Sequence, residues 1–348
     1  MRTFVPFEKI GNQKAIVVDA LHPNALVLSH WKDGNIHPEI AADTSGEIVL
    51  NALKKDFNGL ESKIVSANHF DIDGFVGVFA LCYPELAKAY DEVLREMAII
   101  GDFREYKVNS KTAELALKLC CWVNSREKEN FYRPFGEKAE AKLCDNKFQY
   151  FLKLFPSVLE NPEKFRADWV KEYEHTLSGI EKLNEKCQLT ERKDLGIVIQ
   201  KCQSPSHYYA QFSHSKGFDG VLSIYDDNRY EFEYKYTTWV DIVSRPSLPR
   251  VNLKPLAKEL NQIEKSDYVW EVDHITDTGP ILCLEKDKIS KADRFDSPSN
   301  RAIYSSSIPE DQFTELLTSY LENAYQDIDA KRFWTWDEIK QVNKRVFA

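Results

Sequence analysis

The segment 63–81 constrains the fold more than any other, because an apolar strand, a polar loop and an apolar helix follow one another within it. Ile64 and Val65 are typical of a buried strand, and the run 75–81 is typical of a core helix. A strand that leads through a loop into a helix predicts an α/β unit. In such a unit the loop lies at the carboxyl edge of the sheet, where open α/β sheets bind their ligands.

The loop itself carries three side chains that can bind a metal ion. They are His69, Asp71 and Asp73, and Gly74 follows directly. The two carboxylates would repel each other at this spacing unless a cation lay between them, so the loop predicts a metal site. The alternative is an Asp-rich turn that only caps the following helix.

Other acidic residues are expected at the ends of neighbouring strands. Segments 14–20 and 25–31 are predicted strands, and Asp19 ends the first of them. Segment 98–103 is predicted as a further short strand that ends at Asp102. Because the carboxyl ends of parallel strands meet at one edge, we expect both aspartates beside the loop. Comparable positions are held by His22, His30 and Asp43.

A helix is predicted from about residue 46 to residue 55. Its N-cap is expected from one of three polar residues that precede it, Asp43, Thr44 or Ser45. For Asp43 we therefore favour the role of a helix cap over that of a metal ligand.

Composition is that of a globular protein, with 43% hydrophobic and 29% charged residues. The net charge of −9 argues against an extended nucleic-acid surface, yet permits a small anionic substrate at a metal site. No apolar run has the length of a membrane span and the start lacks the pattern of a signal peptide, so a cytoplasmic location is expected. Cys120 and Cys121 lie in an apolar run and are predicted to be buried free thiols.

The predicted elements divide the chain into three parts. Strands alternate with helices over 1–110, which predicts an α/β domain with a mostly parallel sheet. Helical periodicity over 111–192 predicts a linker or lid, and 193–348 predicts an α+β domain. In the last part we expect, in order, a strand at 207–213, a hairpin turning at 226–228, a strand ending at Arg245 and a helix starting near Pro255.

The pattern His-x-Asp-x-Asp-Gly between a strand and a helix resembles the first motif of the DHH phosphoesterase superfamily. In that family these residues hold one or two divalent ions, usually manganese. The resemblance implies that His69, Asp71 and Asp73 bind Mn²⁺, with Mg²⁺ or Zn²⁺ as alternatives. Asp19 or Asp102 would complete or bridge a second ion, and Asp71 and Asp73 would be the catalytic residues of a phosphoesterase.

A second segment resembles the substrate-binding domain that follows the catalytic domain in DHH enzymes. Arg245, a Pro-rich loop with Arg250 and a helix reading LAKEL follow one another there. The resemblance implies that both arginines grip the anionic group of a small phosphorylated substrate in a cleft between domains. The chain has Asn-Gln-Ile at 261–263 where the family has Gly-Gly-Gly-His, and Val-Asp-His-Ile at 272–275 is its nearest approach to the DHH triplet. These departures keep open a non-catalytic protein whose degenerate site binds a ligand or partner.

Two further patterns compete for the loop. A haloacid-dehalogenase-like phosphatase would use Asp71 as nucleophile and Asp73 as general acid, although Phe75 stands where that family has Thr. An EF-hand fails, because Ala80 occupies the position that needs Glu. The layout as a whole also resembles a bacterial family with no assigned activity. The prediction is therefore a metal-dependent hydrolase, with substrate, metal and oligomeric state left open.

Overall fold

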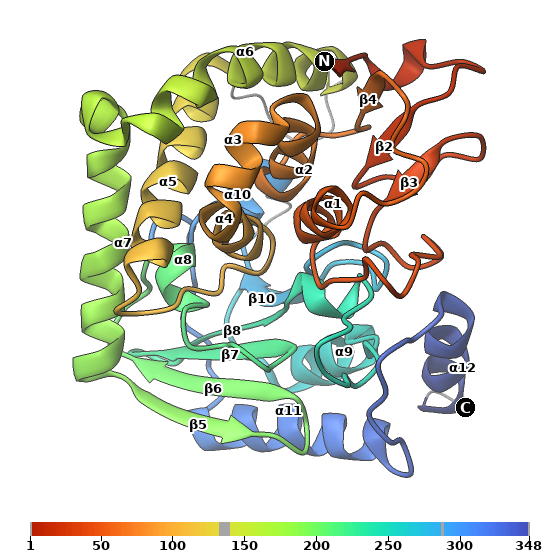
Figure 1. The fold of residues 1–348 in the computed structure, drawn as a ribbon. Helices are drawn as coiled ribbons and strands as arrows, with labels where there is room; N and C mark the ends of the chain where they lie inside the picture. Colours follow the sequence, from red (N-terminus) through yellow and green to blue (C-terminus); the bar gives the residue numbers. More distant parts are fainter. Residues whose placement is uncertain (1, 132–139, 287–288, 347–348) are drawn as a thin grey trace. The chain divides into compact units, whose positions relative to one another are not determined.

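The computed structural model describes residues 2–131, 140–286 and 289–346. The chain divides into two compact units, Met1–His175 and Thr176–Ala348, whose elements are labelled in Figure 1. The boundary falls inside one long helix. Among the described helices, none is long and apolar enough to cross a membrane.

The first unit contains a four-stranded sheet in the order β1–β4–β2–β3, and all its strand pairs are parallel. The strands are β1 (Thr3–Phe4), β2 (Ile16–Val18), β3 (Leu26–Leu28) and β4 (Ile64–Ser66). Parallel sheets are usually covered on both faces, and β2 is buried along its whole length. The predicted parallel N-terminal sheet is confirmed.

Four helices complete this part of the unit: α1 (Ser45–Lys54), α2 (Ile72–Cys82), α3 (Pro84–Ala89) and α4 (Asp91–Phe103). Every residue of α2 is buried, and this helix packs against α1 and α4, as Figure 1 shows. The close approach of α2 to β2 requires Gly77, because a Cβ there would lie 2.6 Å from Val18 Cγ1. The loop after β4 is thus held between a buried strand and a buried helix.

The predicted strand at 98–103 is wrong, because these residues form the end of α4. A short apolar run does not by itself distinguish a buried strand from a buried helix. The residues upstream carry the helical signal, since Leu94, Met97 and Ala98 are buried at helical spacing. Asp102 therefore lies in the last turn of a helix.

The predicted helical segment 111–192 is largely helical. It contains α5 (Lys111–Phe131), α6 (Glu140–Glu160) and α7 (Arg166–Lys186). α6 packs on the first unit through aromatic contacts, with the Phe155 ring 5.1 Å from that of Phe75 and Phe151 stacked on Phe70 at 5.0 Å. These contacts make α5 and α6 part of the first unit, and the division between units comes later, within α7.

The second unit is built on a six-stranded mixed sheet in the order β5–β6–β7–β8–β10–β9, in which only β6 and β7 pair in parallel. The strands are β5 (Gln188–Arg192), β6 (Ile197–Cys202), β7 (Gly220–Tyr225), β8 (Arg229–Tyr234), β9 (Val269–Val272) and β10 (Ile281–Glu285). α9 (Lys254–Ile263) and α11 (Glu310–Tyr325) pack with one face of this sheet in a common apolar core. The remaining helices are α8 (Tyr208–Gln211), α10 (Lys291–Arg294) and α12 (Trp336–Val346).

Two predictions for this unit are confirmed and two are wrong. The hairpin turn at 226–228 and the helix near Pro255 are present as β7–β8 and α9. The segment 207–213 forms α8 instead of a strand, because His207 caps a helical turn by accepting a hydrogen bond from the Tyr209 amide. No strand ends at Arg245.

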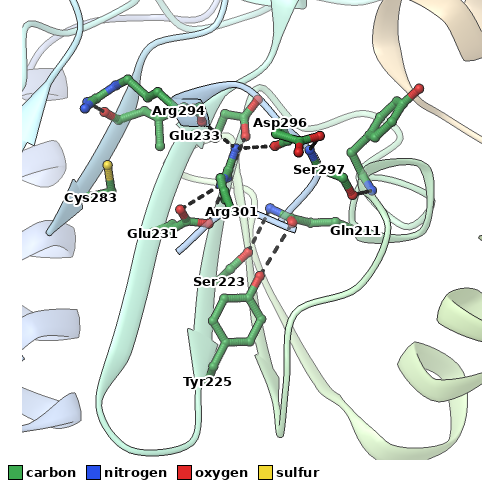
Figure 2. Close-up of polar contacts among 12 residues, drawn as sticks. Gln211, Ser223, Tyr225, Glu231, Glu233, Cys283, Arg294, Asp296, Ser297 and Arg301 are labelled. Carbon is green, nitrogen blue, oxygen red and sulfur yellow. Dashed lines mark hydrogen bonds and ion pairs between the residues drawn. The ribbon is translucent and has the colours of Figure 1, made fainter. Parts of the chain in front are cut away.

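The other face of the second sheet is polar and nevertheless buried. Side chains alternate along a strand, so Tyr230 and Phe232 enter the apolar core while Glu231 and Glu233 point to the opposite face. There they meet Arg301, as Figure 2 shows. We call the charged residues of this face the acid–arginine cluster: Glu231, Glu233, Asp273, Glu285, Arg294 and Arg301.

The cysteines behave in two ways. Cys120 and Cys121 are buried free thiols, as predicted. Cys187 and Cys202 form a disulfide that joins the start of β5 to the end of β6. The antiparallel register places Gln188 opposite Lys201, so the two cysteines flank the end of this strand pair. Their spacing matches no short cysteine motif, and the sequence did not indicate the pair.

Candidate metal centre

Six acidic and histidine side chains of the first unit come together at the carboxyl edge of its sheet. Asp19 follows β2, His30 follows β3, the loop after β4 supplies His69 and Asp71, and the first turn of α2 supplies Asp73. The sixth comes from the end of α4. We call them the acid–histidine cluster: Asp19, His30, His69, Asp71, Asp73 and Asp102.

Asp19 is the centre of the acid–histidine cluster. Its Oδ2 lies 3.2 Å from His69 Nε2, and its Oδ1 lies 3.4 Å from His30 Nε2. Two groups of potential ligand atoms lie within 4.8 Å of one another, Asp19–His69–Asp71 and Asp19–His30–Asp73. Because Asp19 belongs to both groups, the arrangement can hold two ions that share one carboxylate.

The backbone at Asp19 explains how a strand end can deliver this carboxylate. Its φ is 50°, in the left-handed region that few residues other than Gly, Asn and Asp adopt readily. The turn occurs one residue after β2, and the side chain beyond it is buried at 2% exposure.

The N-terminus of α1 binds Asp73. The backbone amide of Ser45 donates to Asp73 Oδ2 and that of Gly46 donates to Asp73 Oδ1, both at 2.8 Å. Free amides and the helix dipole favour an anion at this position. A side chain at Gly46 would block the contact, because its Cβ would lie 2.9 Å from Asp73 Oδ1. Thr44 supplies the N-cap of α1 by accepting from the Glu47 amide, as one of the three predicted candidates.

Asp71 caps α2 and also faces the acid–histidine cluster. Its Oδ1 accepts a hydrogen bond from the Gly74 amide at 2.7 Å and thereby caps α2. Its Oδ2 faces His69 Nε2 at 3.2 Å. Capping thus occupies one oxygen, and the other stays available to the acid–histidine cluster.

His30 and Asp102 form the buried side of the cluster. His30 Nδ1 lies 2.5 Å from the carbonyl oxygen of Asp43. A carbonyl only accepts, so Nδ1 carries a proton and Nε2 faces the carboxylates, the tautomer that a metal-binding histidine needs. Asp102 Oδ2 lies 3.8 Å from His30 Nε2 and has no hydrogen-bond partner among the described residues, although it is buried. Asp43 contributes its carbonyl here.

The cluster holds more carboxylates than histidines. Its four carboxylates form ion pairs with His30 and His69. Burial, followed by repulsion from Asp19, holds the pKa of Asp73 well above its usual range. Burial raises the pKa of Asp102 to about 7. Burial and the neighbouring carboxylates thus disfavour the ionised form of both carboxyls.

For both histidines and for Asp19, the pKa shifts favour the charged form. Burial alone would lower the pKa of His30, but its hydrogen bond to Asp19 and the charges of Asp102 and Asp73 outweigh burial and raise it to about 10. The pKa of His69 is likewise raised against the effect of burial, mainly by the charge of Asp71 and the hydrogen bond to Asp19. The same hydrogen bonds lower the pKa of Asp19, again against burial. These shifts favour the imidazolium forms of His30 and His69 and the ionised form of Asp19.

The two predicted substrate-binding arginines lie in the second unit and have protein partners. Arg245 donates to both carboxylate oxygens of Asp219, at 2.6 and 3.1 Å. Arg250 is fully buried and donates to backbone carbonyls of the loop 275–278 and to Thr238 Oγ1. A buried guanidinium needs such acceptors, so these contacts give Arg250 a structural role, and its substrate role stays a prediction. Arg245 keeps that role only as a prediction without support.

Two residues of the site were underestimated or missed in the sequence. His30 was recognised only as a residue at a strand end comparable to His22, which instead accepts from the Asn24 amide in the turn after β2. Ser45 was considered only as a helix cap. Its contacts with the cluster arise because the α1 N-terminus packs against the segments that carry Asp19, His30 and Asp73. Nothing in the local sequence around residue 45 indicates this packing.

A family model described as "Family of unknown function (DUF6687)" matches residues 1–332, which include the whole acid–histidine cluster. No curated protein matches the chain.

Proposed function

The chain belongs to the family of unknown function DUF6687, and from its site we propose a divalent-metal-dependent hydrolase of small phosphate esters. The metal would bind in the acid–histidine cluster. The observation that carries the proposal is the negative charge crowded into this cluster, where four carboxylates lie beside two histidines. A divalent cation satisfies that charge in a way that bound protons do only partly.

The donor set suits Mn²⁺ best, with Mg²⁺ or Zn²⁺ as alternatives. Mixed carboxylate and imidazole ligands favour first-row divalent ions, and carboxylate-rich sites suit Mn²⁺ and Mg²⁺. Asp19, His30 and Asp73 with Asp102 would hold one ion on the buried side. Asp19 would be shared with His69 and Asp71, which would hold a second ion. The likeness of the loop to the first DHH motif supports the same arrangement.

The two sides of the cluster differ in access to solvent. The side chains of His69 and Asp71 are 35% and 37% exposed, whereas that of Asp73 is fully buried. A small anionic substrate would therefore approach from the His69–Asp71 side. Asp71 Oδ2 lies there as a proton acceptor, and its Oδ1 is fixed by the α2 cap. When bound, the divalent ion supplies charge stabilisation of the phosphoryl oxygens and lowers the pKa of a bound water.

The proposal is tested with protein stripped by EDTA and assayed on aryl phosphate monoesters and diesters with and without Mn²⁺. We expect hydrolysis that depends on Mn²⁺ and falls by at least about 100-fold in Asp19→Asn, because the shared ligand is lost. Asp91→Asn is the matched control, since Asp91 pairs with Arg95 on α4 away from the cluster. Hydrolysis that survives in Asp19→Asn would contradict the proposal. Mn²⁺ binding without hydrolysis of either ester would indicate a binding protein instead.

A further inference from the structure

We infer that Ser45 is the positioning residue of the acid–histidine cluster, which orients its shared carboxylate toward both histidines. The inference rests on the proposed metal function. Ser45 is fully buried at the first position of α1 and contacts three cluster residues, two that follow strands and one in the first turn of α2. Its Oγ donates to Asp19 Oδ1 at 2.7 Å, its Oγ accepts from the His30 amide at 3.2 Å, and its own amide donates to Asp73 Oδ2 at 2.8 Å.

The hydroxyl of Ser45 determines which oxygen of Asp19 faces which histidine. A serine hydroxyl has one proton, and here Asp19 Oδ1 receives it. Oδ1 is the oxygen that lies near His30, and Oδ2 is the oxygen that lies near His69. Rotation of the Asp19 carboxylate would break the bond to Ser45. The hydroxyl thus holds the carboxylate in the orientation that lets it contribute one oxygen to each group of ligands.

The same hydroxyl also holds the main chain that carries His30. The His30 amide donates to Ser45 Oγ, while the His30 ring is anchored on the other side by the Asp43 carbonyl. Both anchors come from the segment that leads into α1. A movement of the α1 N-terminus would therefore displace His30 together with Asp19 and Asp73.

Partners that orient metal ligands typically change metal affinity by about 10- to 100-fold when they are removed. Ser45→Ala removes the donor to Asp19 and the acceptor for His30 but keeps the backbone bond to Asp73. We expect its Kd for Mn²⁺, measured by titration calorimetry on the full chain, to rise by about 10- to 100-fold. Ser45→Thr keeps the hydroxyl and should stay within about threefold of the wild type on the same physical ground.

Thr44→Ala is the matched control for an effect through the helix alone. Thr44 caps α1 next to Ser45, and its side-chain hydrogen bonds go to Glu47. Its loss should lower the Tm of the chain by a few degrees, as the loss of a helix cap does, and leave the Kd for Mn²⁺ unchanged. If Ser45→Ala does not fold, Ser45→Cys replaces it, because a thiol is a weak donor of similar shape and should still weaken binding.

The outcomes separate this inference from the proposed function. A wild-type chain that binds no Mn²⁺ overturns the proposed function and the inference with it. Wild-type binding with an unchanged Kd in Ser45→Ala, or with equal losses in Ser45→Ala and Thr44→Ala, overturns the positioning role alone. A loss confined to the Ser45 variants without a hydroxyl supports it.

Discussion

The two units each bury a group of carboxylates, but they neutralise them differently. In the acid–arginine cluster of the second unit, Glu231 accepts two hydrogen bonds from Arg301 at 2.8 and 2.9 Å (Figure 2). Asp273 accepts from Arg294 at 3.0 Å. In the acid–histidine cluster of the first unit, the carboxylates meet imidazoles, a hydroxyl and backbone amides. Burial of carboxylates therefore does not by itself indicate a ligand site. The partners of the carboxylates, guanidinium ions in one cluster and imidazoles in the other, distinguish the two.

The space beside the acid–arginine cluster is small. The cavity beside the acid–arginine cluster has a volume of about 40 Å³ and is lined in part by Cys283, Glu285, Arg294 and Arg301. That volume holds a water molecule or two and excludes an organic substrate. Burial also raises the pKa of the Cys283 thiol to about 12, so it is not an activated nucleophile. The acid–arginine cluster thus has the properties of a structural network.

The largest change in stability is expected from a substitution in the acid–arginine cluster. Arg301→Met leaves Glu231 buried without its guanidinium and should lower the free energy of unfolding by about 3–5 kcal/mol, measured by urea denaturation. Arg192→Met is the control, because Arg192 forms partly exposed pairs with Asp194 and Glu322 and should cost at most about 1 kcal/mol. Similar losses in the two variants would remove the contrast between buried and exposed pairs on which the comparison depends.

A gain in stability is expected from a substitution in the acid–histidine cluster. Asp102→Asn removes a buried negative charge whose Oδ2 has no hydrogen-bond partner among the described residues. Since the pKa of Asp102 is raised from 3.8 to about 7, the metal-free variant should be more stable than the wild type by roughly 2–4 kcal/mol at pH 8. Its affinity for Mn²⁺ should fall. A less stable metal-free variant would show that Asp102 is a structural residue.

The stability of the metal-free protein should depend on pH, because the pKa values of the acid–histidine cluster are shifted in the folded state. Asp102, Asp73 and His30 all have raised pKa values in the folded state, so each contributes stability below its unfolded pKa and loses it as pH rises through its folded pKa. Asp19 has a lowered pKa, and its contribution is lost only in acid below that window. The Tm of the metal-free chain should therefore fall from pH 5 to pH 8, and Mn²⁺ should suppress the fall. A Tm that rises over this range without metal would contradict the assigned charges.

The smallest effect is expected at Arg245. Arg245→Lys replaces a bidentate contact with Asp219 by a single one and should cost about 1 kcal/mol of stability. Mn²⁺ affinity and Mn²⁺-dependent hydrolysis should not change. A KM raised more than about tenfold at unchanged stability would restore the substrate role that the sequence suggested.

Much of the first unit was predictable because its signals are local. The strand–loop–helix at 63–81 and the strand end at Asp19 follow from apolar runs and turn residues, and the structure brings them together at one sheet edge. Asp102 was predicted to lie at this edge as the end of a strand, and that strand is wrong. It reaches the same edge from the end of α4, because that helix packs beside α2.

The parts that could not be predicted depend on contacts distant in sequence. The partner of Arg245 is Asp219, 26 residues away, and no local pattern distinguishes an arginine held by such a partner from one that binds a substrate. The role of Ser45 likewise arises because the segments that carry Asp19, His30 and Asp73 all contact the N-terminus of α1. Asp71 shows the remaining ambiguity, because a cap and a ligand require the same residue at the same position.

Metal binding by the isolated chain tests the central claim most directly. The measurement is Mn²⁺ uptake by EDTA-treated protein in equilibrium dialysis, comparing the wild type with Asp19→Asn. Asparagine adopts the left-handed backbone found at this position, so the variant changes the charge and leaves the turn unstrained. We expect at least one tightly held ion per wild-type chain and its loss in the variant. No uptake by the wild type, or equal uptake by both proteins, would contradict the account.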